Sequence, residues 1–193
     1  MIFQIISIII LLFFYICYFV KMLNQHKKGI QTNQLGKGKT GFIKFIELTL
    51  QFITCIVPVA EVIGIIMNTV YFSLPVRIIG ICISMTGVAV FVISVVTMQD
   101  NWRAGVSKNE RTELVTSGIY QISRNPAFLG FDLVYIGMIM TFFNWLLFCV
   151  SFIAIVMLHL QIINVEEEFL LEVFGHEYLN YKKKVCRYIG RKH

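Results

Sequence analysis

Charged side chains are scarce in this chain of 193 residues: only 15% are Asp, Glu, Lys or Arg, whereas 57% are hydrophobic. Soluble proteins carry about 25% charged residues, so the composition excludes an ordinary soluble domain and favours a membrane protein. The length leaves no room for a separate soluble module. We therefore expect a single integral-membrane domain over residues 1–193.

Paired cysteines are absent as well. None of the five cysteines belongs to a CxxC pair, and four of them lie in apolar runs, where a free thiol behaves as a small hydrophobic group. The five are Cys17, Cys55, Cys82, Cys149 and Cys186. Their spacing argues against a disulfide framework and against a zinc site, so we expect no metal.

Nucleotide-binding loops are also missing. The stretch GKGKTG at 36–41 ends like a Walker A loop, but the first glycine of that motif would fall on Asn33, and no strand precedes it. We interpret it as a flexible basic connector. Without a GxGxxG motif, a nucleotide-like cofactor must be held by something other than a Rossmann turn. Topology and anionic lipid headgroups explain the net charge of +6, so we expect no nucleic-acid partner.

Long apolar runs, by contrast, are abundant. A bilayer-spanning helix needs about 20 apolar residues, and the last run, 127–163, is long enough for two short helices joined at Asn144 and Trp145. The sequence predicts an all-α, polytopic membrane bundle of about five transmembrane helices, the last two forming a hairpin, followed by a cytoplasmic C-terminal helix. The predicted spans are 2–20, 48–67, 74–98, 127–143 and 146–163.

Lysine and arginine gather on alternate connections. The connections after the first and third spans and the C-terminal tail are basic, whereas the turns near 71–75 and near Asn144 carry almost no charge. Cytoplasmic loops of membrane proteins are enriched in Lys and Arg. We expect the N-terminus outside, and both long connections and the C-terminus in the cytoplasm.

Polar chemistry gathers at the cytoplasmic side of the last two spans. Before the fourth span, SGIYQISRNPAFLGF at 117–131 places Arg124 beside a helix start whose free N–H groups attract an anion. After the fifth span, NVEEEFLLEVFGHEYLNYKKKV at 164–185 predicts a helix with an acidic first turn. Alone, the arginine could be a membrane anchor, and the acids could stabilise the helix dipole. Together they suit a zwitterion such as the amino-acid end of S-adenosylmethionine, whose sulfonium is stabilised by carboxylates and aromatic faces.

These two motifs resemble those of the isoprenylcysteine carboxyl methyltransferases, membrane enzymes related to the phospholipid N-methyltransferases. The resemblance covers about residues 100–188. Its positions here are Leu114, Val115, Gly118, Tyr120, Arg124, Asn125, Pro126, Phe128, Gly130, Glu166, Glu167, Leu170, Phe174, Gly175, Tyr178 and Tyr181. Asn125 stands where the family has His, and Phe128 where it has Tyr. An asparagine can donate and accept hydrogen bonds but does not titrate near neutrality.

The resemblance implies S-adenosylmethionine-dependent methyl transfer at the cytoplasmic membrane face, without a metal. The acceptor would be an amphiphilic, lipid-like or prenylcysteine-like molecule that enters sideways from the bilayer. The cofactor pocket would lie within 100–188, closed by the C-terminal helix. The residues carried over as cofactor-binding are Gly118, Tyr120, Arg124, Asn125, Pro126, Glu166, Glu167 and Tyr178.

Two ionisable residues lie inside the predicted hairpin. If the chain turns at Asn144 and Trp145, Asp132 is level with residue 157, and His159 is about 3 Å lower at 1.5 Å per residue. Ionisable groups inside a span are costly and are usually paired or functional. We predict that Asp132 and His159 pair beside the acceptor as candidate catalytic residues. An ordinary hydrogen bond between the two helices is the alternative.

Two other functions stay open. Membrane sterol reductases have a similar C-terminal arrangement, so an NADPH-dependent reductase-like enzyme is one alternative, although it would require more spans and a more basic pocket. The other is a non-catalytic, methyltransferase-like membrane protein, which Asn125 keeps open.

Overall fold

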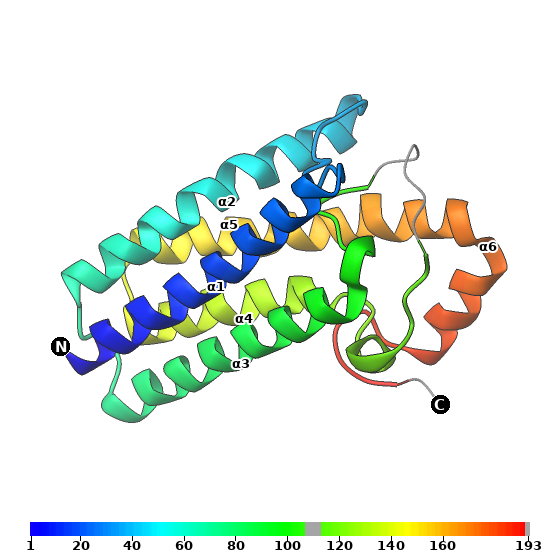
Figure 1. The fold of residues 1–193 in the computed structure, drawn as a ribbon. Helices are drawn as coiled ribbons and strands as arrows, with labels where there is room; N and C mark the ends of the chain where they lie inside the picture. The colour runs from blue at the N-terminus through cyan, green and yellow to red at the C-terminus, as the bar shows by residue number, and fades with distance from the viewer. Residues whose placement is uncertain (107–112, 192–193) are drawn as a thin grey trace.

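The computed structural model describes residues 1–106 and 113–191, and the regular elements in this part are helices (Figure 1). Residues 107–112 of the predicted cofactor-binding region therefore lie outside the described residues. The helices are α1 Ile2–Lys27, α2 Gly41–Met67, α3 Leu74–Met98, α4 Pro126–Thr141, α5 Trp145–Gln161 and α6 Glu167–Lys184. Two 3-10 turns, η1 Gln99–Asn101 and η2 Gly118–Gln121, precede α4, and a π-helical segment, η3 Ile162–Glu166, joins α5 to α6.

The predicted polytopic helical bundle is confirmed. The helices α1, α2, α3 and the one beginning at Trp145 are long and apolar enough to cross a membrane. The fifth predicted span, α4, is apolar but only 16 residues long, about 24 Å at the rise of an α-helix. It is thus shorter than the hydrocarbon core of about 30 Å. The predicted hairpin is also confirmed, because α4 ends at Thr141, α5 begins at Trp145 and the two helices contact each other. The Asn144 side chain caps α5 by accepting the N–H of Leu147 at 2.8 Å.

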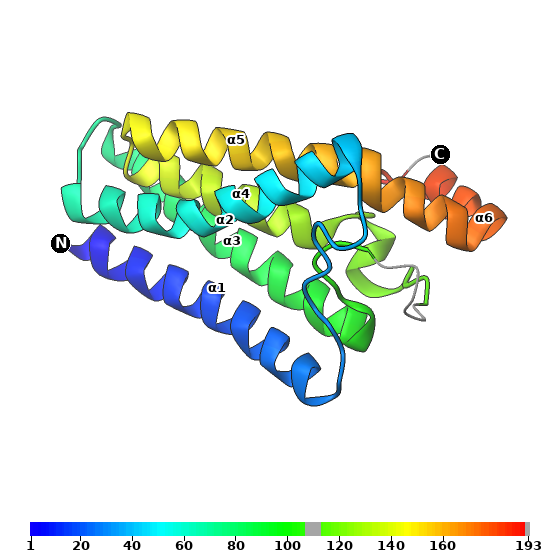
Figure 2. The same ribbon diagram turned by 90° about the horizontal axis from the view of Figure 1, so that it is seen from above.

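The helices lie in layers. Seen from above, α1 lies on one side of the bundle and α5 on the opposite side, with α2, α3 and α4 between them (Figure 2). The connection 28–40 and the described parts of the connection 99–125, which are 99–106 and 113–125, lie at the same end of the bundle as α6, away from the N-terminus (Figure 1). The first connection is bonded to the second, because Gln34 N–H donates to Ala104 O at 2.8 Å and Ala104 N–H to Thr32 O at 2.9 Å. The connector expected to be flexible is therefore anchored just before its GKGKTG stretch.

A seam of glycines joins α3 to α4. A Cβ atom on Gly80 would lie 2.7 Å from Gly137 O, and one on Gly87 would lie 2.8 Å from Gly130 O. No side chain fits at these distances, so the two backbones touch. Small residues commonly allow such close approach between membrane helices. The seam fixes the start of α4, where the Arg124 motif ends.

Candidate active site

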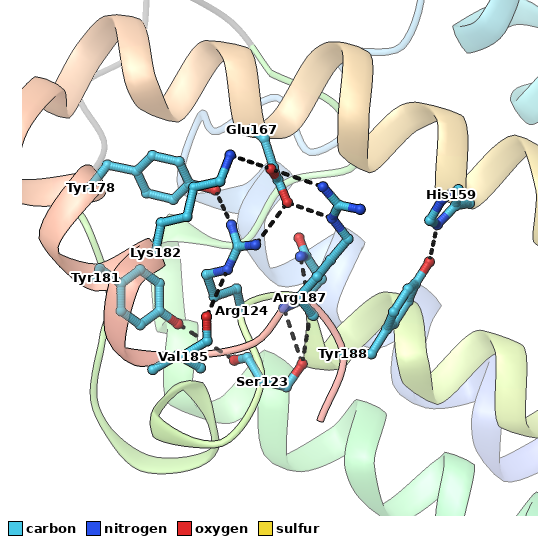
Figure 3. Close-up of polar contacts among 11 residues, drawn as sticks. Ser123, Arg124, His159, Glu167, Tyr178, Tyr181, Lys182, Val185, Arg187 and Tyr188 are labelled. Carbon is cyan, nitrogen blue, oxygen red and sulfur yellow. Dashed lines mark hydrogen bonds and ion pairs between the residues drawn. The ribbon is translucent and has the colours of Figure 1, made fainter. Parts of the chain in front are cut away.

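The two motifs found in the sequence meet at an ion pair. Arg124 lies between η2 and the start of α4, and Glu167 is the first residue of α6. The Arg124 Nη2 atom lies 3.1 Å from the Glu167 Oε1 atom, and the two side chains are 4% and 6% exposed (Figure 3). A buried charge is stable only when it is paired and hydrogen-bonded. The pair therefore ties α6 to the segment that begins α4.

Glu167 is held by two further cations. Arg187 Nε lies 2.6 Å from Oε1, and Lys182 Nζ lies 3.0 Å from Oε2 (Figure 3). Burial alone would raise the pKa of the Glu167 carboxyl, but the hydrogen bonds from Arg187 and Lys182, together with the charge of Arg124, outweigh it and lower this pKa to about 2. Glu167 is therefore a carboxylate at physiological pH.

Arg124 uses all three guanidinium nitrogens within the protein. Besides the ion pair, its Nη1 donates to the Tyr178 hydroxyl at 2.7 Å, and its Nε donates to Val185 O at 3.2 Å (Figure 3). Tyr178 reaches this position because α6 bends at Gly175, whose φ of 48° lies in the left-handed region that favours glycine. The second half of α6 thereby returns toward η2, where the Tyr181 hydroxyl donates to Tyr120 O at 2.6 Å.

The segment after α6 runs across the Arg124 motif. Arg124 N–H donates to Cys186 O at 3.1 Å, and Gly190 N–H donates to Ile122 O at 2.8 Å. The Asn125 amide donates to Arg187 O at 3.2 Å. In this chain the asparagine that replaces the family histidine thus binds the backbone of the tail.

The other predicted residues of the first motif support this arrangement. Gly118 opens η2 next to Thr97 of α3, Tyr120 is buried, and Pro126 occupies the first turn of α4, as its residue type indicated. Sequence reasoning missed Lys182 and Arg187 as part of the cluster. The positive-inside rule already accounted for their charges as part of a basic cytoplasmic tail. No local pattern in the sequence indicates that they pair with Glu167.

A cleft lies beside the ion-pair cluster, between the end of α3 and the start of α6. Its lining residues are Met98, Asn101, Arg103, Gly105, Val106, Glu113, Glu166, Phe169, Leu170 and Phe174. Glu166 is thus the predicted cofactor-binding residue that faces the cleft. Burial raises the pKa of the Glu166 carboxyl to about 7; a hydrogen bond from Gln161 opposes this shift, and the charge of Glu47 adds to it. The cleft combines charged groups of both signs with an apolar wall.

His159 contacts the tail. Its Nδ1 atom lies 2.6 Å from the Tyr188 hydroxyl, and the two rings stack at 14° (Figure 3). Asp132 is buried, and its Oδ1 atom has no hydrogen-bond partner within residues 1–106 and 113–191. Burial, and then the charge of Asp132, raise the pKa of Tyr188 to about 12, so the hydroxyl that shares the hydrogen bond with His159 stays protonated. The tyrosine, which the sequence did not single out, is therefore the partner of His159. A catalytic role for Asp132 and His159 stays a prediction.

Removing the Tyr188 hydroxyl is expected to loosen the tail. A Tyr188→Phe variant keeps the ring stack but loses one hydrogen bond, which is worth about 1 kcal/mol. We expect thermal unfolding in detergent to show that the free energy of unfolding falls by this amount. The matched control is Tyr71→Phe, because the Tyr71 side chain is 70% exposed. Equal behaviour of the two variants would contradict the assigned contact.

Comparison with known proteins gives two matches. Residues 75–177, from the start of α3 to the second half of α6, match the phospholipid methyltransferase family. Protein-S-isoprenylcysteine O-methyltransferase of Saccharomyces cerevisiae is 38% identical over 72 residues, which are 37% of this chain and 30% of the yeast protein. The aligned part thus spans less than a third of that relative. Arg124 and Glu167, which come from the two sequence motifs, both lie within the residues that match the family.

Proposed function

This chain belongs to the phospholipid methyltransferase family, and on that premise we propose that it transfers a methyl group from S-adenosylmethionine to a lipid-like acceptor. The observation that carries the proposal is the buried contact between Arg124 and Glu167. It joins the two motifs of the family resemblance beside a cleft that Glu166 lines. The apolar helices keep the protein in the membrane, where an amphiphilic acceptor dissolves.

The lining of the cleft fits the chemistry of the methyl donor. S-adenosylmethionine carries an ammonium, a carboxylate, a sulfonium and an aromatic base. Glu113 and Glu166 would attract its cations and Arg103 its carboxylate, while Phe169 and Phe174 offer an apolar wall for the base. We assign Arg124, Glu167 and Tyr178 the role of holding this wall in place, because the nitrogens of Arg124 are already bonded within the protein.

Methyl transfer relies mainly on positioning. The donor supplies an activated methyl group, and the protein has to align the acceptor with it in a site that excludes water. The rigid ion-pair cluster would fix α6 as one side of that site. If the acceptor group has a proton to lose, Asp132 is the proposed base, because its Oδ1 atom is buried and unpaired within the described residues.

We propose that the site faces the cytoplasm. The connection 28–40 and the described parts of the connection 99–125 lie at the same end of the bundle as α6 (Figure 1). The sequences of both connections are rich in lysine and arginine. By the positive-inside rule this end is cytoplasmic, and the N-terminus lies on the opposite side. The name of the yeast relative suggests that the acceptor is prenylcysteine-like.

Binding of labelled S-adenosylmethionine to the full chain in lipid nanodiscs tests the proposal. We expect saturable binding, competition by S-adenosylhomocysteine, and transfer of the labelled methyl group into the lipid extract. Arg124→Ala should weaken binding by about tenfold or more, a loss of about 1.4 kcal/mol, because the wall of the cleft loses its anchor. The control is Glu168→Ala, since Glu168 is exposed next to Glu167.

Three results would contradict the proposal. Failure of the parent protein to bind the donor would remove its basis. A preference for NADPH would favour the reductase-like alternative. Tight donor binding without methyl transfer to any lipid or prenylcysteine substrate would favour a non-catalytic relative.

A further inference from the structure

A second cluster of polar side chains lies where α2, α5 and η3 meet. Gln161, the last residue of α5, is fully buried, and its Nε2 atom donates to Glu47 Oε1 at 3.3 Å and to Glu166 Oε1 at 3.4 Å. Glu47, on α2, is also fully buried, and its other oxygen accepts the N–H of Gly36 at 2.7 Å. One neutral amide thus bridges two acids from distant parts of the chain.

This cluster has more acceptors than donors. The Oε1 atom of Gln161 has no hydrogen-bond partner within the described residues. Neither Glu47 nor Glu166 forms an ion pair with any residue in 1–106 or 113–191. Buried acceptors are normally satisfied, and an orphan among them calls for a missing donor. Two acids and an unpaired carbonyl oxygen suit a small cation that carries several N–H groups.

The cluster adjoins the cleft. Glu166 lines the cleft directly, and Ile43, about one turn before Glu47 on α2, packs against Val106 and Phe169, which line it as well. The Glu47 and Gln161 side chains therefore lie behind the wall formed by Glu166. Both side chains are fully buried and do not line the cleft themselves, so a ligand in the cleft would reach them only by displacing the Glu166 side chain.

We propose that Glu47, Gln161 and Glu166 bind the ammonium group of the methyl donor. The inference rests on the function proposed above and adds a residue of α2, Glu47, which lies outside the family match at 75–177. A primary ammonium has three N–H donors, one for each of the three side chains. Its positive charge also compensates two acids that form no ion pair within the described residues, although the charge of Lys39 acts on Glu166.

The test compares two ligands that differ only in this group. One is S-adenosylhomocysteine, and the other is its analogue with hydrogen in place of the amino group. The parent protein in nanodiscs is expected to bind the first at least about tenfold more tightly. Glu47→Gln should remove most of this preference by weakening S-adenosylhomocysteine alone. Gln161→Met, which keeps the side-chain length but removes Oε1, should act in the same direction.

The control is Glu61→Gln, which neutralises another buried acid on the same helix and should leave the preference intact. If the parent protein binds both ligands equally, the ammonium site is wrong while the proposed function stands. Equal weakening of both ligands by Glu47→Gln also overturns the inference, because it indicates a structural role. If the parent protein binds neither ligand and no S-adenosylmethionine, the proposed function itself fails.

Discussion

A Gly137→Leu variant is expected to lose the native bundle. The added side chain would have to occupy the space of the Gly80 carbonyl and the Ser84 backbone, with Ser84 N 2.7 Å from its first carbon atom. Overpacking a core that can relax costs about 1–3 kcal/mol. Here the obstacle is the backbone of α3, which cannot move aside as a side chain can by changing its rotamer. We therefore expect the free energy of unfolding to fall by more than about 3 kcal/mol.

Thermal unfolding and size-exclusion profiles in detergent would measure this loss. The matched control is Ile136→Leu, at the preceding residue, which is 40% exposed. This control should unfold with the parent protein. A Gly137→Leu protein that unfolds at the same temperature as the control would show that the helices do not touch as described.

A Glu167→Gln variant is expected to produce the second large effect. Gln cannot neutralise Arg124, which stays buried without a counter-ion, and breaking a buried pair in this way costs about 3–5 kcal/mol. The contacts to Lys182 and Arg187 add less, because these side chains are 41% and 31% exposed and water screens them. Thermal unfolding of Glu167→Gln measures this loss of stability. The control is Glu168→Gln, because Glu168 is the exposed neighbouring residue.

The acid dependence of unfolding gives a second readout of the same carboxylate. The pKa of Glu167 is lowered to about 2 in the folded protein, below the ordinary value of about 4.3. Its stabilising contribution is therefore complete above about pH 5 and is lost as the pH falls through about 2. The parent protein should lose this part of its stability on acidification, and Glu167→Gln should not. Identical acid profiles would contradict the assigned ion pairs.

Hydropathy predicted the helices best where an apolar run ends abruptly. The predicted span 74–98 has the same bounds as α3, because Ser73 and Gln99 flank an apolar segment whose single charged residue is Arg77. The first two helices are longer than predicted, since α1 runs on to Lys27 and α2 begins at Gly41. Backbone hydrogen bonds continue beyond the apolar part of a helix, whereas hydropathy detects only that part.

The sequence predicted that Arg124 and Glu167 belong to one site, because each lies in a motif and the two motifs occur in the same order in the family that the chain resembles. The contacts of Arg187 and Tyr188 could not be predicted, because they depend on where the chain runs after α6. That path is set by the bend at Gly175, and a glycine within a helical pattern does not reveal whether the helix bends there. Long-range contacts of this kind have no local signal.

The glycine seam also restricts how a lipid can reach the interior. Since the backbones of α3 and α4 touch at both Gly80 and Gly87, no acyl or prenyl chain can pass between these two helices. If the chain has the proposed function, a lateral portal for the acceptor would open at another helix boundary. Bulky side chains could be introduced one at a time along the other helix boundaries. The position at which such a side chain blocks entry of the acceptor would locate the portal.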